Sequence, residues 1–239
     1  MNTFDSFDVG EDAGGDDVYW MSIGDLMSGL MFIFILALSV FMINITEVTD
    51  QLVNKDKIRQ EILQQIKKEM ESKGFTEFKI VSDQGILRLE QGVLFNSGED
   101  KLLPRGERLL KALGPVIADV LDKPKFKGTV ETIFIEGHTD NDPIIYARKF
   151  DNNWDLSAQR AIKTWLFMSH AEPALKVLKN EKKERVFSVS GYADSRPIAS
   201  NATEAGKRLN RRIDFRFNMV PPESDQNNKA KQAIESKVN

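Results

Sequence analysis

The architecture of this chain is decided by the stretch VYWMSIGDLMSGLMFIFILALSVFMI, residues 18–43. At 1.5 Å per residue, its roughly 26 residues give about 39 Å of helix, which is enough to cross a bilayer with some tilt. The stretch therefore predicts a transmembrane helix over residues 18–45. A cleavable signal peptide fits less well, because the segment is too long, follows no basic region and precedes no small-residue cleavage site.

Asp25 is the only charged side chain in this apolar run. A carboxylate in hydrocarbon is costly unless it faces a bundle interior and serves an ion pathway, so we predict an ion-translocation site at Asp25. The alternative is a carboxylate at the interfacial end, but Tyr19 and Trp20 already resemble an interfacial belt before it. Small residues that allow close approach of other helices surround it. They are Ser22, Gly24, Ser28 and Gly29.

The composition excludes several kinds of site. The net charge is −3, which argues against a nucleic-acid partner. The sequence has no cysteine and only two histidines, His138 and His170. Disulfides and thiolate metal sites are therefore excluded, and a histidine-rich zinc site is not expected. We expect neither a metal nor a cofactor.

The segments that flank the apolar run are polar. Residues 1–17 carry six acidic and no basic side chains and predict an acidic tail. Residues 46–74 predict a helical stalk, whose apolar stripe could face a twin helix in a dimer or pack on the following domain. The stripe consists of Val48, Leu52, Ile58, Ile62, Ile66 and Met70. The nearest basic residues, Lys55, Lys57 and Arg59, would by charge alone place the C-terminal side in the cytoplasm.

Residues 75–219 predict an α/β sandwich, because short alternating runs are interspersed with helical periodicity. Extended segments are expected at 78–81, 86–90, 92–95, 129–136, 186–190 and 212–218. Helices are expected from Pro104, with Leu109, Leu113 and Val116 on the apolar face, and over 156–169. Residues 220–239 predict a polar C-terminal tail.

Four ordered blocks carry a family resemblance: VLFNSG at 93–98, IEGHTDN at 135–141, NWDLSAQRA at 153–161, and SGYADSRP at 190–197 with NRRI at 210–213. Together they resemble the OmpA-like peptidoglycan-binding domain. The resemblance implies that Asp140 and Arg160 hold the charged ends of diaminopimelate in the wall peptide. It also assigns Asn153, Leu156, Ser157, Arg211 and Arg212 to the same site.

Other interpretations of these blocks are a surface ion pair of Asp140 with Arg160 and a helix cap at Asn153. The segment between Asp140 and Asn153 is longer than in OmpA, so the two ligand residues keep their register only if that loop bulges outward. A catalytic pair of His138 and Asp140 lacks a nucleophile motif, and we do not expect an enzyme.

A membrane aspartate, a stalk and an OmpA-like domain are together similar to the MotB-like stator subunits of ion-driven motors. The sequence SIGDLMSGLM and the acidic leader resemble the ZorB branch of the Zorya anti-phage system. This resemblance implies a homodimer inside a pentamer of a multi-span ZorA-like partner, driven by an ion that we expect to be a proton. It implies a bacterial inner-membrane protein with a cytoplasmic N-terminus and a periplasmic domain. A flagellar stator subunit and a passive wall anchor remain the alternatives.

Overall fold

The computed structural model describes residues 14–144 and 149–221 and divides the chain into two compact units, residues 1–50 and 51–239. The predicted tails therefore lie almost entirely outside the described residues. Helix α1 (Gly14–Ser72) contributes to both units.

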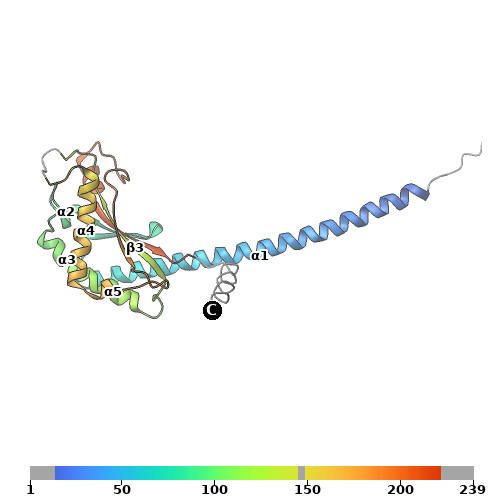
Figure 1. Ribbon diagram of the computed structural model, residues 1–239, viewed down its shortest axis with the longest axis horizontal. Helices are drawn as coiled ribbons and strands as arrows, with labels where there is room; N and C mark the ends of the chain where they lie inside the picture. Colours follow the sequence, from blue (N-terminus) through green and yellow to red (C-terminus); the bar gives the residue numbers. More distant parts are fainter. Residues whose placement is uncertain (1–13, 145–148, 222–239) are drawn as a thin grey trace, which may run out of the picture. The chain divides into compact units, whose positions relative to one another are not determined.

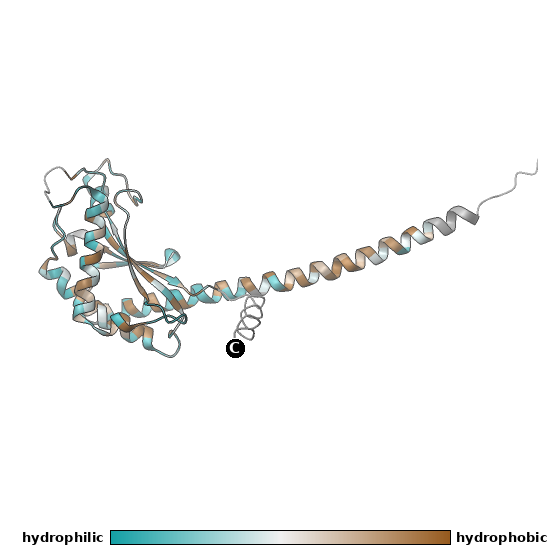
Figure 2. Cartoon of the chain, viewed as in Figure 1, coloured by the Kyte–Doolittle hydropathy of each residue, from teal (hydrophilic) through white to brown (hydrophobic). Residues whose placement is uncertain are grey.

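The first unit consists of the N-terminal part of α1. Its apolar side chains are exposed around the helix from Trp20 to Ile45, and Figure 2 shows this run as a brown stretch. One 18-residue window has a mean hydropathy of 2.6. By length and composition, this helix is suited to crossing a membrane.

The second unit contains a five-stranded sheet in the order β1-β2-β5-β3-β4. The strands are β1 (Phe78–Val81), β2 (Ile86–Glu90), β3 (Val130–His138), β4 (Phe187–Gly191) and β5 (Arg212–Met219). Strands β3 and β4 are parallel, and the other neighbours are antiparallel. The parallel pair is connected through α4 (Asn153–Ala171), which packs against β3, β4 and α3 (Pro104–Asp122) (Figure 1).

Three short helices complete the domain: α2 (Gln91–Leu94), α5 (Ala174–Val177) and α6 (Glu204–Asn210). A 3-10 turn, Ser82–Gln84, connects β1 with β2. The alternation of strands and helices confirms the predicted α/β domain. The sheet is mixed, because β5 returns between β2 and β3.

The C-terminal part of α1 belongs to the core of this domain. Ile62, Leu63, Ile66 and Met70 are 0% exposed and cluster with Leu110 of α3 and with the inner face of the sheet. Of the two alternatives for the apolar stripe, the structure therefore supports packing on the domain for this part of α1. The segment predicted as a stalk contributes to the core of the domain predicted to begin at residue 75.

Two predicted segments differ from the structure by more than two residues or in type. Residues 92–95 were expected to be extended, but α2 is helical to Leu94, and Phe95 makes only an isolated bridge with Leu102. Helix α4 begins at Asn153 and not at Leu156, because Asn152 caps it by accepting from the backbone N–H groups of Trp154 and Asp155. The helix cap expected at Asn153 is thus one residue earlier.

Candidate functional site

A cavity of about 400 Å³ brings together most of the predicted wall-binding residues. It lies where the end of β3, the start of α4, the segment after α2 and the end of α6 meet. Its lining residues are Ser97, Gly98, Thr139, Asp140, Asp142, Pro143, Ile144, Asn153, Leu156, Arg160 and Arg211. The longer loop thus leaves Asp140 and Arg160 in one site, while its residues 145–148 lie outside the described part of the chain.

Two glycines place α4 close to the strands that end at the cavity. A Cβ atom on Gly137 would lie 2.0 Å from the carbonyl oxygen of Ser157, and one on Gly191 would lie 2.6 Å from the backbone nitrogen of Ala158. Any side chain at these positions would push the helix away. The close approach fixes the N-terminal half of α4, including Arg160, beside the end of β3.

Ser157 does not line the cavity. Its hydroxyl donates to the carbonyl of Trp154 (3.0 Å) and accepts from the backbone N–H of Ala193 (3.0 Å). The side chain is 0% exposed. The bond with Ala193 joins α4 to the chain after β4 and so helps to position the site.

Arg160 of α4 lines the cavity and contacts the segment after α2. Its guanidinium donates to the backbone carbonyls of Glu99 (2.8 Å) and Asn96 (3.0 Å), and the residue is only 2% exposed. Burial lowers the pKa of Arg160 to about 10, although the nearby Asp140 carboxylate opposes this shift. The guanidinium therefore remains charged at neutral pH and places a fixed cation at the cavity.

Asp140 is held by Arg211 and not by a direct pair with Arg160. Its carboxylate accepts a charge-assisted hydrogen bond from Arg211 and one from the backbone N–H of Asp142 (3.2 Å). Lys207 of α6 pairs with Asp142 at 2.7 Å. The amide of Asn153 donates to the carbonyls of Asp140 (3.2 Å) and Asp142 (3.0 Å), so three side chains fix this loop.

Arg212 lies apart from the cavity. It is 4% exposed and donates to the Asp214 carboxylate (3.0 Å) and to the carbonyls of Asn210 and Arg196. Arg211 follows the last turn of α6, whereas Arg212 is the first residue of β5. Of the two adjacent arginines, Arg211 lines the cavity, whereas Arg212 pairs with Asp214 in the sheet.

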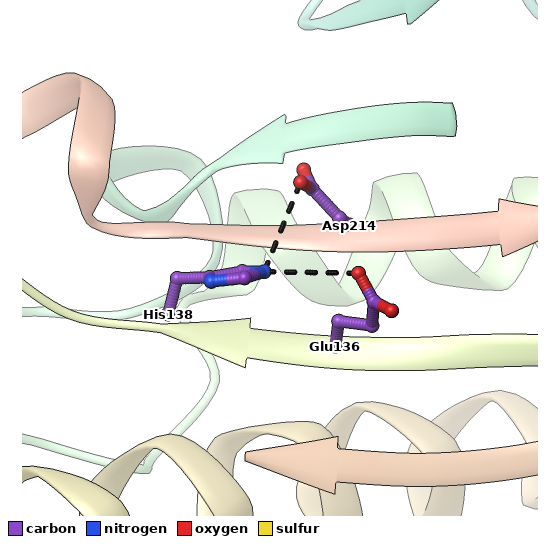
Figure 3. Close-up of side chains that lie close together, drawn as sticks. All are labelled: Glu136, His138 and Asp214. Atoms are coloured by element: carbon purple, nitrogen blue, oxygen red, sulfur yellow. Dashed lines mark ion pairs between the residues drawn. The ribbon is translucent and has the colours of Figure 1, made fainter. Parts of the chain in front are cut away.

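A buried charged cluster lies on the sheet next to the site (Figure 3). One ring nitrogen of His138 is 3.8 Å from carboxylate oxygens of both Glu136 and Asp214. The donor atoms of the three residues lie within 4.8 Å of one another, which would suit a metal ion by distance. However, bidentate pairs with Arg216 and Arg88, together with Arg212, already neutralise the two carboxylates. A divalent cation would thus add charge to a cluster that is already positive.

This cluster fixes the end of β3 that carries Asp140. Burial disfavours the Glu136 anion, but the two hydrogen bonds from Arg216 and the nearby His138 ring outweigh it and hold the pKa of Glu136 at about 2. Burial also lowers the pKa of His138, whose ring stacks on Tyr192. The motif blocks do not predict this network, although the alternation of Arg212, Asp214 and Arg216 with apolar residues along one strand is a signal for it.

Asp25 lies in the first unit, on the exposed surface of α1. Ser22, Asp25 and Gly29 follow a spacing of three and four residues and so share one face of the helix. Cβ atoms placed on Gly24 and Gly29 would meet no atom within 4 Å. Ser22, Gly24, Ser28 and Gly29 have small side chains or none, so another helix could approach this part of α1 closely.

Comparisons with known proteins agree with this geometry. Residues 94–211 match the model of the OmpA family. Motility protein B of Bacillus subtilis (strain 168) is 32% identical over 139 residues, which cover 58% of this chain and 46% of that protein. The Zorya protein ZorB of Escherichia coli (strain Crooks) is 24% identical over 215 residues, which cover 84% of this chain and 88% of that protein.

Among solved structures, a putative MotB-like protein from Desulfovibrio vulgaris superposes with a TM-score of 0.55 at 20% identity. The match covers 70% of this chain and 98% of that one and supports the fold. The chain spans about half the length of the Bacillus relatives it matches, 46% of each.

The second unit of this chain is therefore an OmpA-like domain built on a mixed α/β sheet. Over most of its length the chain is similar to the Zorya protein ZorB, and over a shorter region it is similar to Motility protein B.

Proposed function

We propose that this protein is a membrane-anchored, peptidoglycan-binding stator subunit of an ion-driven rotary motor in anti-phage defence. The observation that carries the proposal is the cavity in which Asp140, Arg160 and Arg211 meet. It belongs to the same chain as an apolar helix with a single carboxylate, Asp25. One polypeptide thus joins a candidate wall anchor to a candidate ion site.

The cavity has the chemistry of a site for a zwitterion. Diaminopimelate in a wall peptide carries an ammonium and a carboxylate, which need a fixed anion and a forked cation. The Asp140 carboxylate binds the ammonium, and the guanidinium groups of Arg160 and Arg211 attract the carboxylate. Binding and not catalysis is the role of this site, and it needs no cofactor.

At the membrane end, Asp25 takes up and releases the ion at the boundary with a multi-span, ZorA-like partner. A homodimer of this chain lies inside a pentamer of that partner, and the pentamer rotates as the ion passes. The small residues around Asp25 allow the partner helices to approach closely. The wall-bound domain supplies the reaction torque.

The proposed location is the bacterial inner membrane, with the N-terminus in the cytoplasm and the domain in the periplasm, where peptidoglycan lies. Lys55, Lys57 and Arg59 oppose this orientation by charge alone. However, two of these side chains make contacts within the second unit. Lys55 donates a hydrogen bond to the carbonyl of Val220, and Arg59 forms an ion pair with Asp56 at 3.0 Å. Reporter fusions at each terminus test the orientation.

A flagellar stator subunit is the second candidate, and the 32% identity with Motility protein B favours it. The longer alignment with ZorB, over 84% of the chain, favours the defence motor. A passive wall anchor would have no use for a carboxylate in an apolar helix. Neighbouring genes distinguish defence from motility.

Asp25→Asn tests the motor directly, because it keeps the size of the side chain and removes the charge that the ion exchanges. We expect the variant to copurify with the partner at wild-type levels and to lose protection against phage. Asp25→Glu should retain part of the protection against phage. If Asp25→Asn cells remain protected, or stay motile in the flagellar case, the ion-site proposal fails.

A further inference from the structure

A second cavity, of about 520 Å³, lies between the start of α3 and the second half of α4. Leu102, Leu166 and Phe167 give it apolar lining. Neither the predicted site residues nor the proposed function assigns a role to it. Its position relative to the first cavity suggests one.

The two cavities lie along one stripe of α4. Leu156 and Arg160 line the first, and Lys163, Phe167 and His170 line the second. Steps of four and three residues place all five on one face of the helix. At 1.5 Å per residue, the centres of the two sets are about 13 Å apart along the axis.

The segment after α2 also joins the two cavities. Ser97 and Gly98 line the first cavity, whereas Asp100 and Lys101 line the second. Arg160 holds this segment from the inside through the carbonyls of Asn96 and Glu99. Consecutive residues of one segment therefore line both cavities.

Positive charge exceeds negative charge in the second cavity. Three lysines line it, but Lys149 is already paired with the buried Asp100. Lys101 and Lys163 make no ion pair with any residue that the structure describes, and Glu107 is the one other carboxylate in the lining. The cavity thus suits a ligand that carries a carboxylate next to apolar groups.

We propose that the second cavity binds the acidic remainder of the wall stem peptide whose diaminopimelate occupies the first. This inference rests on the proposed wall binding and adds a specificity to it. The D-glutamate is bonded directly to the diaminopimelate, and the long side chains of Lys101 and Lys163 shorten the distance of about 13 Å that its carboxylate must cover. The free α-carboxylate of the peptide's D-glutamate is the group that Lys101 and Lys163 bind. The protein therefore distinguishes wall peptides with this carboxylate free from those in which it is amidated.

Titration calorimetry on the full-length protein in detergent tests this inference with two synthetic stem tetrapeptides, one with the D-glutamate carboxylate free and one with it amidated. Exposed ion pairs are weak, so wild type should bind the free acid about three- to tenfold more tightly. The double variant Lys101→Gln/Lys163→Gln should bind both peptides equally. Lys111→Gln, an exposed lysine of α3 outside both cavities, should keep the wild-type preference.

Wild type without a preference, or a double variant that keeps it, would overturn the inference. The proposed wall binding is tested separately in the same titrations, because Asp140→Ala should lose affinity for both peptides alike. If Asp140→Ala binds both as wild type does, the first cavity is not the diaminopimelate site.

Discussion

Arg160 and Asp140 both line the candidate site, but they contribute differently to folding. Arg160 is buried and satisfies two backbone carbonyls, whereas Asp140 accepts from one backbone N–H and from Arg211. A buried polar group that loses its partner costs about 1–3 kcal/mol. The two residues should therefore not be treated as equivalent binding mutants.

We predict that Arg160→Met lowers the free energy of unfolding by about 2–4 kcal/mol, because it leaves the carbonyls of Asn96 and Glu99 without their donor. Asp140→Asn should cost clearly less, because its amide oxygen can still accept from the Asp142 N–H and from Arg211. Urea unfolding of residues 51–239 measures both. Equal costs for the two variants would contradict this account of Arg160.

The charged cluster predicts that the domain is less stable in acid. The pKa of Glu136 is about 2 in the fold against an ordinary value of 4.5, so its contribution is present above pH 4.5 and is lost towards pH 2. The pKa of His138 is lowered from 6.5, so the unfolded chain takes up this proton first as the pH falls. Stability should therefore begin to fall below pH 6.5.

In urea titrations from pH 8 to pH 2, His138→Gln should flatten the decline that begins just below pH 6.5. Glu136→Gln should reduce the decline that begins near pH 4.5, because it removes the carboxyl group that titrates there. If the His138→Gln curve is parallel to that of wild type, the histidine does not contribute to the acid sensitivity.

At the scale of elements, the C-terminal part of α1 supplies part of the domain core. Ile62, Leu63, Ile66 and Met70 are fully buried in the core. At about 1.5–3 kcal/mol each, these side chains contribute about 6–12 kcal/mol, which is comparable to the whole stability of a typical domain. A fragment that begins after α1 lacks the contribution of all four side chains.

We therefore predict that residues 51–239 unfold cooperatively in urea, whereas residues 75–239 do not form a stable fold. Circular dichroism and urea titration of the two fragments provide the comparison. A cooperative transition of the shorter fragment at a similar midpoint would show that α1 is dispensable for the domain.

The sequence predicted most elements, because alternation and helical periodicity reveal which face of each segment is buried. The sequence did not decide what α1 packs against. The apolar stripe from Ile58 to Met70 has the same helical period whether the helix faces a twin helix or a sheet. Residues 92–95 were misassigned because a four-residue helix has too few residues for a periodic signal. The motif blocks predicted the cavity residues, but only the three-dimensional placement separates Arg211 from Arg212.

At the scale of the whole molecule, the proposed motor requires force to pass from the apolar N-terminal helix to the domain through α1. Ile58 is partly buried, and Ile62 to Met70 are packed in the core, so the path enters the domain before Gly74. A flexible insert should uncouple the two units only if it is placed upstream of this docked part. Gly/Ser chains behave as random coils and store little torsion.

We predict that Gly/Ser inserts between Asp50 and Gln51 progressively abolish protection against phage as they lengthen, while wall binding persists. The same inserts after Gly74 should have little effect, because they only lengthen a loop within the domain. Survival of infected cells measures the difference. Protection that is indifferent to inserts at both positions would favour the passive anchor.

The most direct test of the central claim is cosedimentation of the full-length protein, in detergent, with isolated peptidoglycan. Wild type and Lys111→Gln should sediment with the wall alike. Asp140→Ala removes the fixed anion of the cavity, and its affinity should fall at least about tenfold, as expected when a desolvated charged contact is lost. Undiminished sedimentation of a folded Asp140→Ala protein would contradict the claim that this cavity anchors the protein to the wall.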